Sequence, residues 1–218
     1  MSIFNHVCSL GTLCHVAMIQ KRLQLRTCSY PFDWVFSNMD VIRECLEDDF
    51  KTFLDKSCYT DKGHKQCGHT KYHPKMFNHH NPLRHLRDYQ YYERCVDRFR
   101  VLLQVTEPKL FIMMMHNLTP GVITEELKTK VIEFNKVLGE HTSNYTLLVI
   151  MHVKEQKERH HVFSYYDNVH FLELHTLSKS GGVAFVKNPS DNKYLDNILC
   201  HEYKFDIDKT HMVENDGM

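Results

Sequence analysis

The sequence predicts an α/β fold in three layers, with a mostly parallel sheet covered by helices on both faces. Two observations support it: nearly continuous apolar runs of strand length occur at 110–115 and 145–152, and amphipathic helical periods alternate with them. We expect residues 1–218 to form a single α/β domain. An irregular His-rich insertion is expected at about 56–82, and a flexible polar tail at about 206–218.

The first half of the chain is predicted to contain one strand and several helices around the insertion. Residues 4–10 are apolar enough for a short strand, and Gly11 allows the chain to turn. Asn38 is a typical helix cap, and the long helix before Pro108 has apolar residues at spacings of three and four. Helices are expected at 13–24, 39–48, 49–54 and from about 84 to 105.

The second half reads as buried strands with amphipathic helices between them. Thr124 can cap one helix, Gly139 is expected to end it, and a last helix runs from Asp191 to about Cys200. His116 and Asn117 are expected in the loop after the first of these strands. The strands are predicted at Leu110–Met115, Tyr145–His152 and Val169–Leu174.

Composition argues against several classes of protein. There are 27 basic and 27 acidic residues, so the formal net charge of zero gives no support to general nucleic-acid binding. No stretch of about 18 apolar residues exists to span a membrane, and no secretory signal is visible. The eight cysteines lie mostly within apolar or helical patterns rather than in a disulfide framework. A reducing, cytoplasmic location is therefore expected.

One cysteine lies where a nucleophile would be expected. Cys14 follows the predicted first strand and the turn at Gly11, so it falls in the first turn of a helix. Unpaired backbone N–H groups and the helix dipole at that point favour an anion, so we expect a lowered pKa for the Cys14 thiol. Cysteine is also among the most buried residue types, so a purely structural role stays open.

Motifs in the first half of the chain resemble the domain family of unknown function named "putative papain-like cysteine peptidase". The motifs are Ser9-Leu10-Gly11-x-x-Cys14-x-x-Ala17, Arg26-x-x-Ser29-x-Pro31-Phe32-Asp33-Trp34, Phe77-x-His79-His80 and Tyr92-x-Arg94-x-x-x-Arg98-Phe99. Members are bacterial, sometimes beside glycosyltransferase domains, or from large DNA viruses. A viral source would place the protein in the host cytoplasm.

This resemblance implies cysteine peptidase-like chemistry at Cys14. A papain-type fold takes its histidine from a later antiparallel β-domain, whereas the alternating strands and helices here favour a flavodoxin-like or SGNH-hydrolase-like sheet. In such sheets the nucleophile also follows the first strand, so the expected site is the same.

A cysteine nucleophile needs a base, and the base needs an orienting group. We favour His80 as the base, then His79, then His116, with an exposed loop histidine as the alternative for each. Asp33 could orient the imidazole or form a structural ion pair with Arg94 or Arg98.

Further residues are expected to contact a substrate. The turn residues Ser9 and Gly11 lie beside Cys14 in sequence, and Trp34 belongs to a proposed wall of the site. His116 and Asn117 are expected at the carboxyl end of a strand, where α/β sites form. Asn117 could donate to an oxyanion, although asparagine at such a position is also a common turn former.

The insertion contains a possible structural zinc site. Cys58, His64, Cys67 and His69 lie within a segment without an apolar period, and His73 follows. Zinc takes four Cys or His ligands, but these spacings match no common ligand pattern closely. A solvated His-rich loop without metal is the alternative, and no other cofactor is expected.

Three functional hypotheses follow. The first is a cysteine-dependent hydrolase or transferase that acts on a peptide or another acyl compound through Cys14. The second is a non-catalytic binding module that holds an anionic ligand or partner at the same turn, with Cys14 simply packed. The third is a glycan-modifying accessory protein, which is suggested only by the glycosyltransferase domains found beside some family members.

Overall fold

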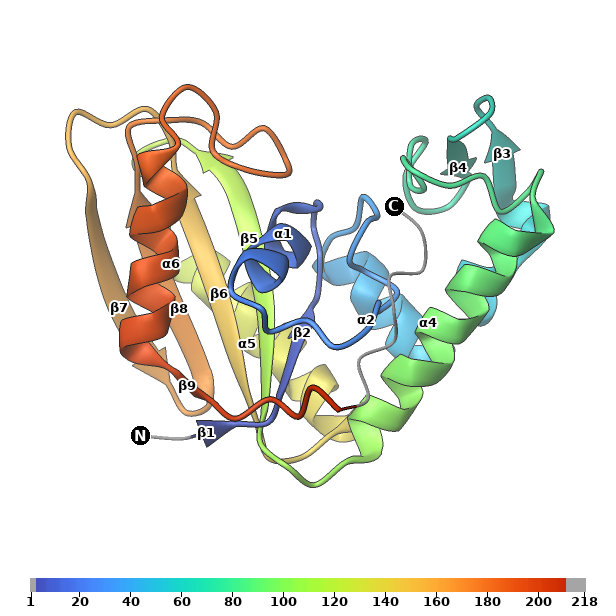
Figure 1. Cartoon of the computed structure of the whole chain (residues 1–218), viewed down its shortest axis with the longest axis horizontal. Coiled ribbons are helices and arrows are strands. Elements are labelled where there is room, and N and C mark those ends of the chain that lie inside the picture. Colours follow the sequence, from blue (N-terminus) through green and yellow to red (C-terminus); the bar gives the residue numbers. More distant parts are fainter. Residues whose placement is uncertain (1–2, 211–218) are drawn as a thin grey trace.

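A five-stranded sheet forms the centre of the computed structural model, which describes residues 3–210 (Figure 1). Four strands run parallel, and the edge strand β7 pairs antiparallel with β8. In spatial order the strands are β2 (His6–Ser9), β5 (Lys109–Leu118), β6 (Tyr145–Val153), β8 (Val169–His175) and β7 (His160–Tyr166). The predicted mostly parallel α/β sheet is confirmed.

Helices cover both faces of this sheet, as predicted. Alternate residues of β5 point to opposite sides: Ile112 packs in one apolar cluster and Phe111 in the other. Helices α1 and α6 contribute to the first cluster, and α2, α4 and α5 to the second. Their bounds are α1 (His15–Arg22), α2 (Met39–Glu47), α4 (Leu86–Gln104), α5 (Glu125–His141) and α6 (Ser190–Glu202).

Two predicted helix caps are present, and one predicted helix end is wrong. The side chains of Asn38 and Thr124 accept hydrogen bonds from the N–H groups of Val41 and Leu127, at 2.9 and 3.2 Å. Helix α5 continues through Gly139 to His141. A Cβ at Gly139 would lie 3.1 Å from the Tyr145 hydroxyl, so this glycine allows close packing rather than ending the helix.

The sheet differs from the sequence prediction in three places. Strand β2 lies at the edge of the sheet, whereas a flavodoxin-like order places the first strand inside. Strand β5 continues beyond Met115 to Leu118 through a register shift, so His116 and Asn117 belong to the strand. Strand β7 was not predicted, because its residues are polar or aromatic and mostly exposed.

The segment expected to be irregular is folded around an aromatic core. Phe77 is fully buried and contacts the rings of Phe53, Tyr59 and Tyr92. A bridge from Phe77 to Val35 joins the insertion to the body of the protein, and a bridge from Phe77 to Cys67 lies within the insertion. The elements of the insertion are the 3-10 helix η1 (Lys56–Cys58), β3 (Tyr59–Asp61) and β4 (Cys67–His69). The predicted helix at 49–54 is present before it as α3 (Lys51–Leu54).

The first and last strands of the described chain lie beside each other at the amino end of the sheet. Strands β1 (Ile3–Phe4) and β9 (Lys204–Phe205) form a short parallel pair. Most of the predicted tail, residues 211–218, lies outside the described residues. Within residues 3–210, no helix is both long enough and apolar enough to cross a membrane.

Candidate active site

A tight turn joins β2 to α1 and fixes the position of Cys14. The Ser9 hydroxyl accepts a hydrogen bond from the Gly11 N–H at 3.1 Å, and the Thr12 hydroxyl donates to the Met114 carbonyl at 2.6 Å. Gly11 has a φ of 77°, and a Cβ there would collide with the Ser37 hydroxyl. Ser9 and Gly11 therefore shape the turn, and Cys14 lies directly before the first residue of α1.

The structure brings Cys14 together with His79. The Cys14 Sγ lies 3.5 Å from the His79 Nε2, within the range of a sulfur–nitrogen hydrogen bond. Both side chains line a cavity of about 590 Å³. A thiol, an imidazole and a ligand-sized space therefore occupy one site.

The segment that contains Trp34 positions His79. The Trp34 ring meets the His79 ring edge-on, with 6.4 Å between centroids. The Phe36 N–H donates to the Met76 carbonyl at 3.0 Å, just before His79 in the chain. Trp34 is buried and lies behind the imidazole, so it supports the site instead of lining the cavity.

Burial determines the ionisation of the Cys14–His79 pair. It raises the pKa of Cys14 to about 11, even though the backbone N–H of Cys14 itself stabilises the thiolate. Burial also lowers the pKa of His79. The expectation of a lowered Cys14 pKa is therefore wrong: loss of water outweighs the helix start, and thiol and imidazole are both neutral at pH 7.

The cavity lies at the carboxyl ends of the parallel strands, where α/β proteins place their sites. Cys14 follows β2, Asn117 is the second-last residue of β5, Lys154 follows β6, and the loop at 178–183 follows β8. The lining residues are Leu13, Cys14, Phe36, Asn78, His79, Asn117, Lys154, Lys179, Ser180, Gly181, Gly182 and Val183.

Asn117 holds the loop that forms one wall of this cavity. Its Nδ2 donates to the Ser180 carbonyl at 2.9 Å, and its Oδ1 accepts from the Ser180 N–H at 2.7 Å. Asn117 has a φ of 59°, a conformation that asparagine tolerates well. Both amide atoms of Asn117 bond Ser180, so its contacts show a structural role in the loop, and its role as an oxyanion donor stays a prediction.

A buried histidine cluster lies beneath the same loop. The Ser180 hydroxyl is 2.9 Å from the His15 Nδ1 and 3.1 Å from the His116 Nδ1. His152 accepts from the Asn117 N–H at 3.2 Å. Burial lowers the pKa of His15 to about 3 and the pKa values of His116 and His152 to about 4. His116 therefore supports the loop and is not among the residues that line the cavity.

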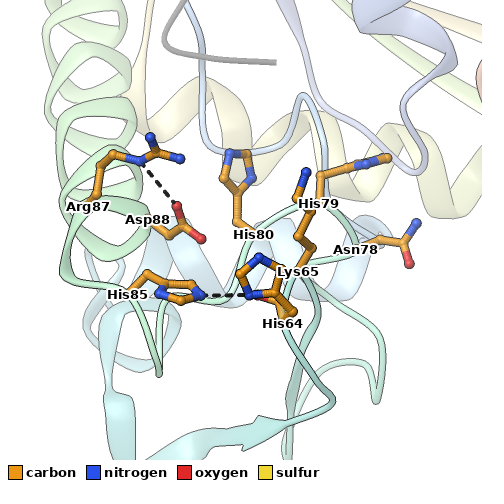
Figure 2. A pocket seen from close by; sticks show the side chains of 8 residues that line it. All are labelled: His64, Lys65, Asn78, His79, His80, His85, Arg87 and Asp88. Carbon is orange, nitrogen blue, oxygen red and sulfur yellow. Dashed lines mark hydrogen bonds and ion pairs between the residues drawn. The ribbon is translucent and has the colours of Figure 1, made fainter.

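His80 lies on the other side of its segment. Its Nδ1 is 3.3 Å from the Tyr92 hydroxyl, and its ring stacks on Tyr91 with 4.6 Å between centroids. In Figure 2 its side chain points in a different direction from that of His79. The geometry thus favours His79 over His80, which is the reverse of the predicted preference.

Asp33 belongs to a buried ion pair. Its Oδ2 accepts from the Arg26 Nε at 3.4 Å and from the Tyr30 N–H at 3.0 Å. The Arg26 guanidinium also bonds the Ser29 hydroxyl and lies over the Trp34 ring, 5.5 Å from its centroid. These contacts fix the segment at 26–34 and give no support to Asp33 as the group that orients a catalytic histidine.

The comparison with protein families agrees with the resemblance seen in the sequence. The family model described as "Putative papain-like cysteine peptidase (DUF1796)" matches residues 5–176. The chain belongs to this family. No match was found among curated proteins or among solved structures. In this member of the DUF1796 family the sheet is mostly parallel, unlike the papain-type arrangement that the description suggests.

The four predicted zinc ligands of this DUF1796 protein do not converge. His69 uses both ring nitrogens, with the Thr52 carbonyl at 3.1 Å and the Tyr72 N–H at 3.2 Å. Cys67 contacts the Gly68 carbonyl, Cys58 contacts Asp55, and His64 packs against His85. In the described part of the chain no three His, Cys, Asp or Glu side chains are grouped to hold a metal. The residues present therefore do not fit a zinc ion.

The far wall of the cavity in this DUF1796 protein was not predicted. Lys154 and the loop from Lys179 to Val183 follow β6 and β8 and carry no familiar motif. The glycine pair at 181–182 was the only available signal, because such a pair permits close approach of backbone and ligand. Asn78, next to His79, was also missed.

Proposed function

We propose that this protein is a cysteine-dependent acyl hydrolase or acyltransferase, with Cys14 as the nucleophile and His79 as the base. The observation that supports it most strongly is the 3.5 Å contact between the Cys14 Sγ and the His79 Nε2 at the wall of a 590 Å³ cavity. Family membership is consistent with this chemistry.

The first step starts from the neutral pair. The His79 Nε2 takes the thiol proton while the Cys14 sulfur forms a bond to the acyl carbon, and the carbonyl π electrons move to oxygen. The tetrahedral intermediate then collapses. The bond to the leaving amine or alkoxide breaks, and that group takes the proton from His79. A thioester on Cys14 remains.

In the second step a water molecule or another nucleophile attacks the thioester. His79 takes a proton from the attacking group, and the new carbon–oxygen or carbon–nitrogen bond forms. The carbon–sulfur bond breaks, and the proton returns from His79 to the Cys14 sulfur. Transfer to water gives hydrolysis, and transfer to another acceptor gives an acyltransferase.

The negative charge on the carbonyl oxygen needs donors. The backbone N–H of Cys14 lies close enough to stabilise its own thiolate. The Gln66 Nε2 donates to the Asn78 Oδ1 at 3.0 Å, which leaves the Asn78 NH₂ group to donate. Since Asn78 lines the cavity beside His79, we assign it to the oxyanion.

The direct test is to trap the thioester. Purified protein is incubated with p-nitrophenyl acetate, digested, and searched by mass spectrometry for a hydroxylamine-sensitive acetyl group on the Cys14 peptide. We expect acylation of the wild type, none of Cys14→Ser, and normal acylation of Cys200→Ser, whose cysteine is exposed on α6. Asn78→Ala should acylate about 10²-fold more slowly. An unmodified Cys14 in the wild type would favour the binding-module hypothesis.

A further inference from the structure

The cavity around Cys14 is lined by positive charge alone. Lys154 and Lys179 are its only charged lining residues besides the titratable Cys14–His79 pair, whose resting form is neutral. The Lys154 Nζ lies 3.9 Å from the Glu155 carboxylate, which is not part of the lining. Lys179 forms no ion pair with any residue in the described range 3–210. The whole chain, by contrast, has equal numbers of basic and acidic residues.

A second cavity of about 550 Å³ shares lining residues with the first, and Figure 2 shows the side chains that line it. His79 and Asn78 line both, so the two spaces meet at the proposed base. Lys65 and Arg87 contribute cations to the second cavity, against the single carboxylate of Asp88.

The Asp88 carboxylate already has two partners within the protein. The Asp88 Oδ2 accepts from the Asn81 N–H at 2.8 Å, and its Oδ1 lies 3.8 Å from the Arg87 Nε. Asp88 is buried, whereas the Arg87 side chain is 88% exposed. Arg87 and Asp88 carry opposite charges, so Lys65 gives the second cavity its net positive charge. Charge on both sides of His79 therefore favours an anion, and in a concave site such a field raises the local concentration of anionic ligands.

We propose that the substrate is an acidic peptide, with a carboxylate side chain held by Lys154 and Lys179 next to the acyl group that Cys14 attacks. A second carboxylate, on the other side of that group, would lie near Lys65. The inference rests on the proposed function, because only acyl chemistry at Cys14 makes the bound peptide a substrate. A carboxylate fits lysine ammonium groups through charge-assisted hydrogen bonds.

Two alkylating reagents measure the field at Cys14 independently of catalysis. Iodoacetate is anionic and iodoacetamide is neutral, and the rates of both reactions are followed at Cys14 and at the exposed Cys200 of the same molecules. We expect the iodoacetate-to-iodoacetamide ratio to be about fivefold higher at Cys14 than at Cys200 at low salt, and to fall as salt is added.

Matched variants assign this preference to the two lysines. The double variant Lys154→Gln/Lys179→Gln should bring the ratio at Cys14 close to that at Cys200, and Lys154→Arg/Lys179→Arg should keep it high. Lys136→Gln/Lys204→Gln, which removes two exposed lysines of α5 and β9, is the control and should change nothing. A Cys14 ratio equal to that of Cys200, or one that the double Gln variant leaves unchanged, overturns the proposal.

Peptide binding tests the substrate class itself. A fluorescent peptide with glutamates at alternate positions is titrated into Cys14→Ala protein and compared with its glutamine analogue and its lysine analogue. We expect the acidic peptide to bind at least about tenfold more tightly, and Lys154→Gln/Lys179→Gln to remove that preference. Equal binding of all three peptides contradicts the proposal. Failure of thioester formation with a high alkylation ratio would instead refute the catalytic role while retaining the acidic partner.

Discussion

At the scale of single residues, the proposed chemistry starts from a protonated Cys14 sulfur. Burial raises the pKa of Cys14 to about 11 and lowers that of His79, so the pair rests as thiol and imidazole. A neutral pair protects the cysteine from oxidation, since thiolate is the reactive form. It also requires His79 to act as a base during attack, rather than as the partner of a preformed thiolate.

The Arg26–Asp33 pair gives the first prediction. Arg26→Met leaves the fully buried Asp33 carboxylate without its cationic partner, which should lower the free energy of unfolding by about 3 kcal/mol at pH 7.5. Because burial raises the pKa of Asp33 to about 6, the carboxyl is mostly protonated at pH 5 and the loss should be smaller there. Urea unfolding at the two pH values measures both.

Asp33→Asn in the Arg26→Met background is the control for that prediction. Removing the charge should recover part of the lost stability at pH 7.5 and little at pH 5. A loss below about 1 kcal/mol at pH 7.5 in Arg26→Met would show that the pair does not stabilise the segment behind Trp34.

The sequence could identify the histidine segment but not the histidine. The two side chains point in different directions, so His79 faces Cys14 and His80 faces Tyr92. Which histidine faces Cys14 depends on how Phe77 and Met76 pack in the insertion, and that packing has no local sequence signal. The raised pKa of Cys14 was not predicted either, because it results from burial, and burial depends on how the whole chain folds.

At the scale of elements, Asn117 connects β5 to the loop that closes the cavity. Asn117→Ala should remove both hydrogen bonds to Ser180 and put a less tolerant residue at a φ of 59°. We expect a loss of about 2 kcal/mol in stability and faster amide hydrogen exchange across 178–183.

Asn117→Gly separates the two causes, because glycine accepts the backbone conformation but has no amide group. It should be less destabilised than Asn117→Ala and should show the same increase in exchange at 178–183. Unchanged exchange in both variants would mean that other contacts, such as those of the Ser180 hydroxyl, suffice to hold the loop.

Elements with a strong apolar pattern were predictable, and those stabilised by context were not. Strands β5, β6 and β8 have buried runs, and α2 and α5 have caps that act locally. Strand β7 has an exposed, polar surface and is stabilised by pairing with β8. The hairpin of β3 and β4 likewise depends on Phe77, which is distant in sequence from β3.

At the scale of the whole molecule, the buried histidines make stability depend on pH. His15, His116 and His152 have folded pKa values of about 3, 4 and 4, below the ordinary 6.5, so the unfolded chain binds more protons between those values. Their contribution is complete above pH 6.5 and is lost as the pH falls toward 4. Asp33, with a raised pKa of about 6, acts in the opposite direction between about 4 and 6.

Three histidines against one carboxyl leave a net uptake of about two protons on unfolding near pH 5. The free energy of unfolding should therefore fall by about 3 kcal/mol per pH unit there. Burial also lowers the pKa values of other histidines, such as His69 and His80, and these add to the slope. Urea unfolding between pH 7.5 and 4.5 measures it.

His116→Asn should reduce the pH dependence of the free energy of unfolding by the contribution of about one proton. His201→Asn, at an exposed position of α6, is the control and should leave this pH dependence unchanged. A free energy of unfolding that stays level from pH 6.5 to 4.5 would contradict the assignment of neutral histidines to the buried cluster.

The assignment of His79 as the base for Cys14 is tested most sharply by the pH dependence of Cys14 acylation. It is measured in the wild type, His79→Gln and His80→Gln. The wild-type rate should rise as His79 loses its proton, below pH 6.5, and then stay level toward neutral pH. In His79→Gln the rise of the rate with pH should disappear, and the rate at pH 7 should fall at least about 10²-fold. The rate of His80→Gln should stay within a few fold of the wild-type rate. Equal acylation rates for His79→Gln and the wild type would contradict the role of His79 as the base.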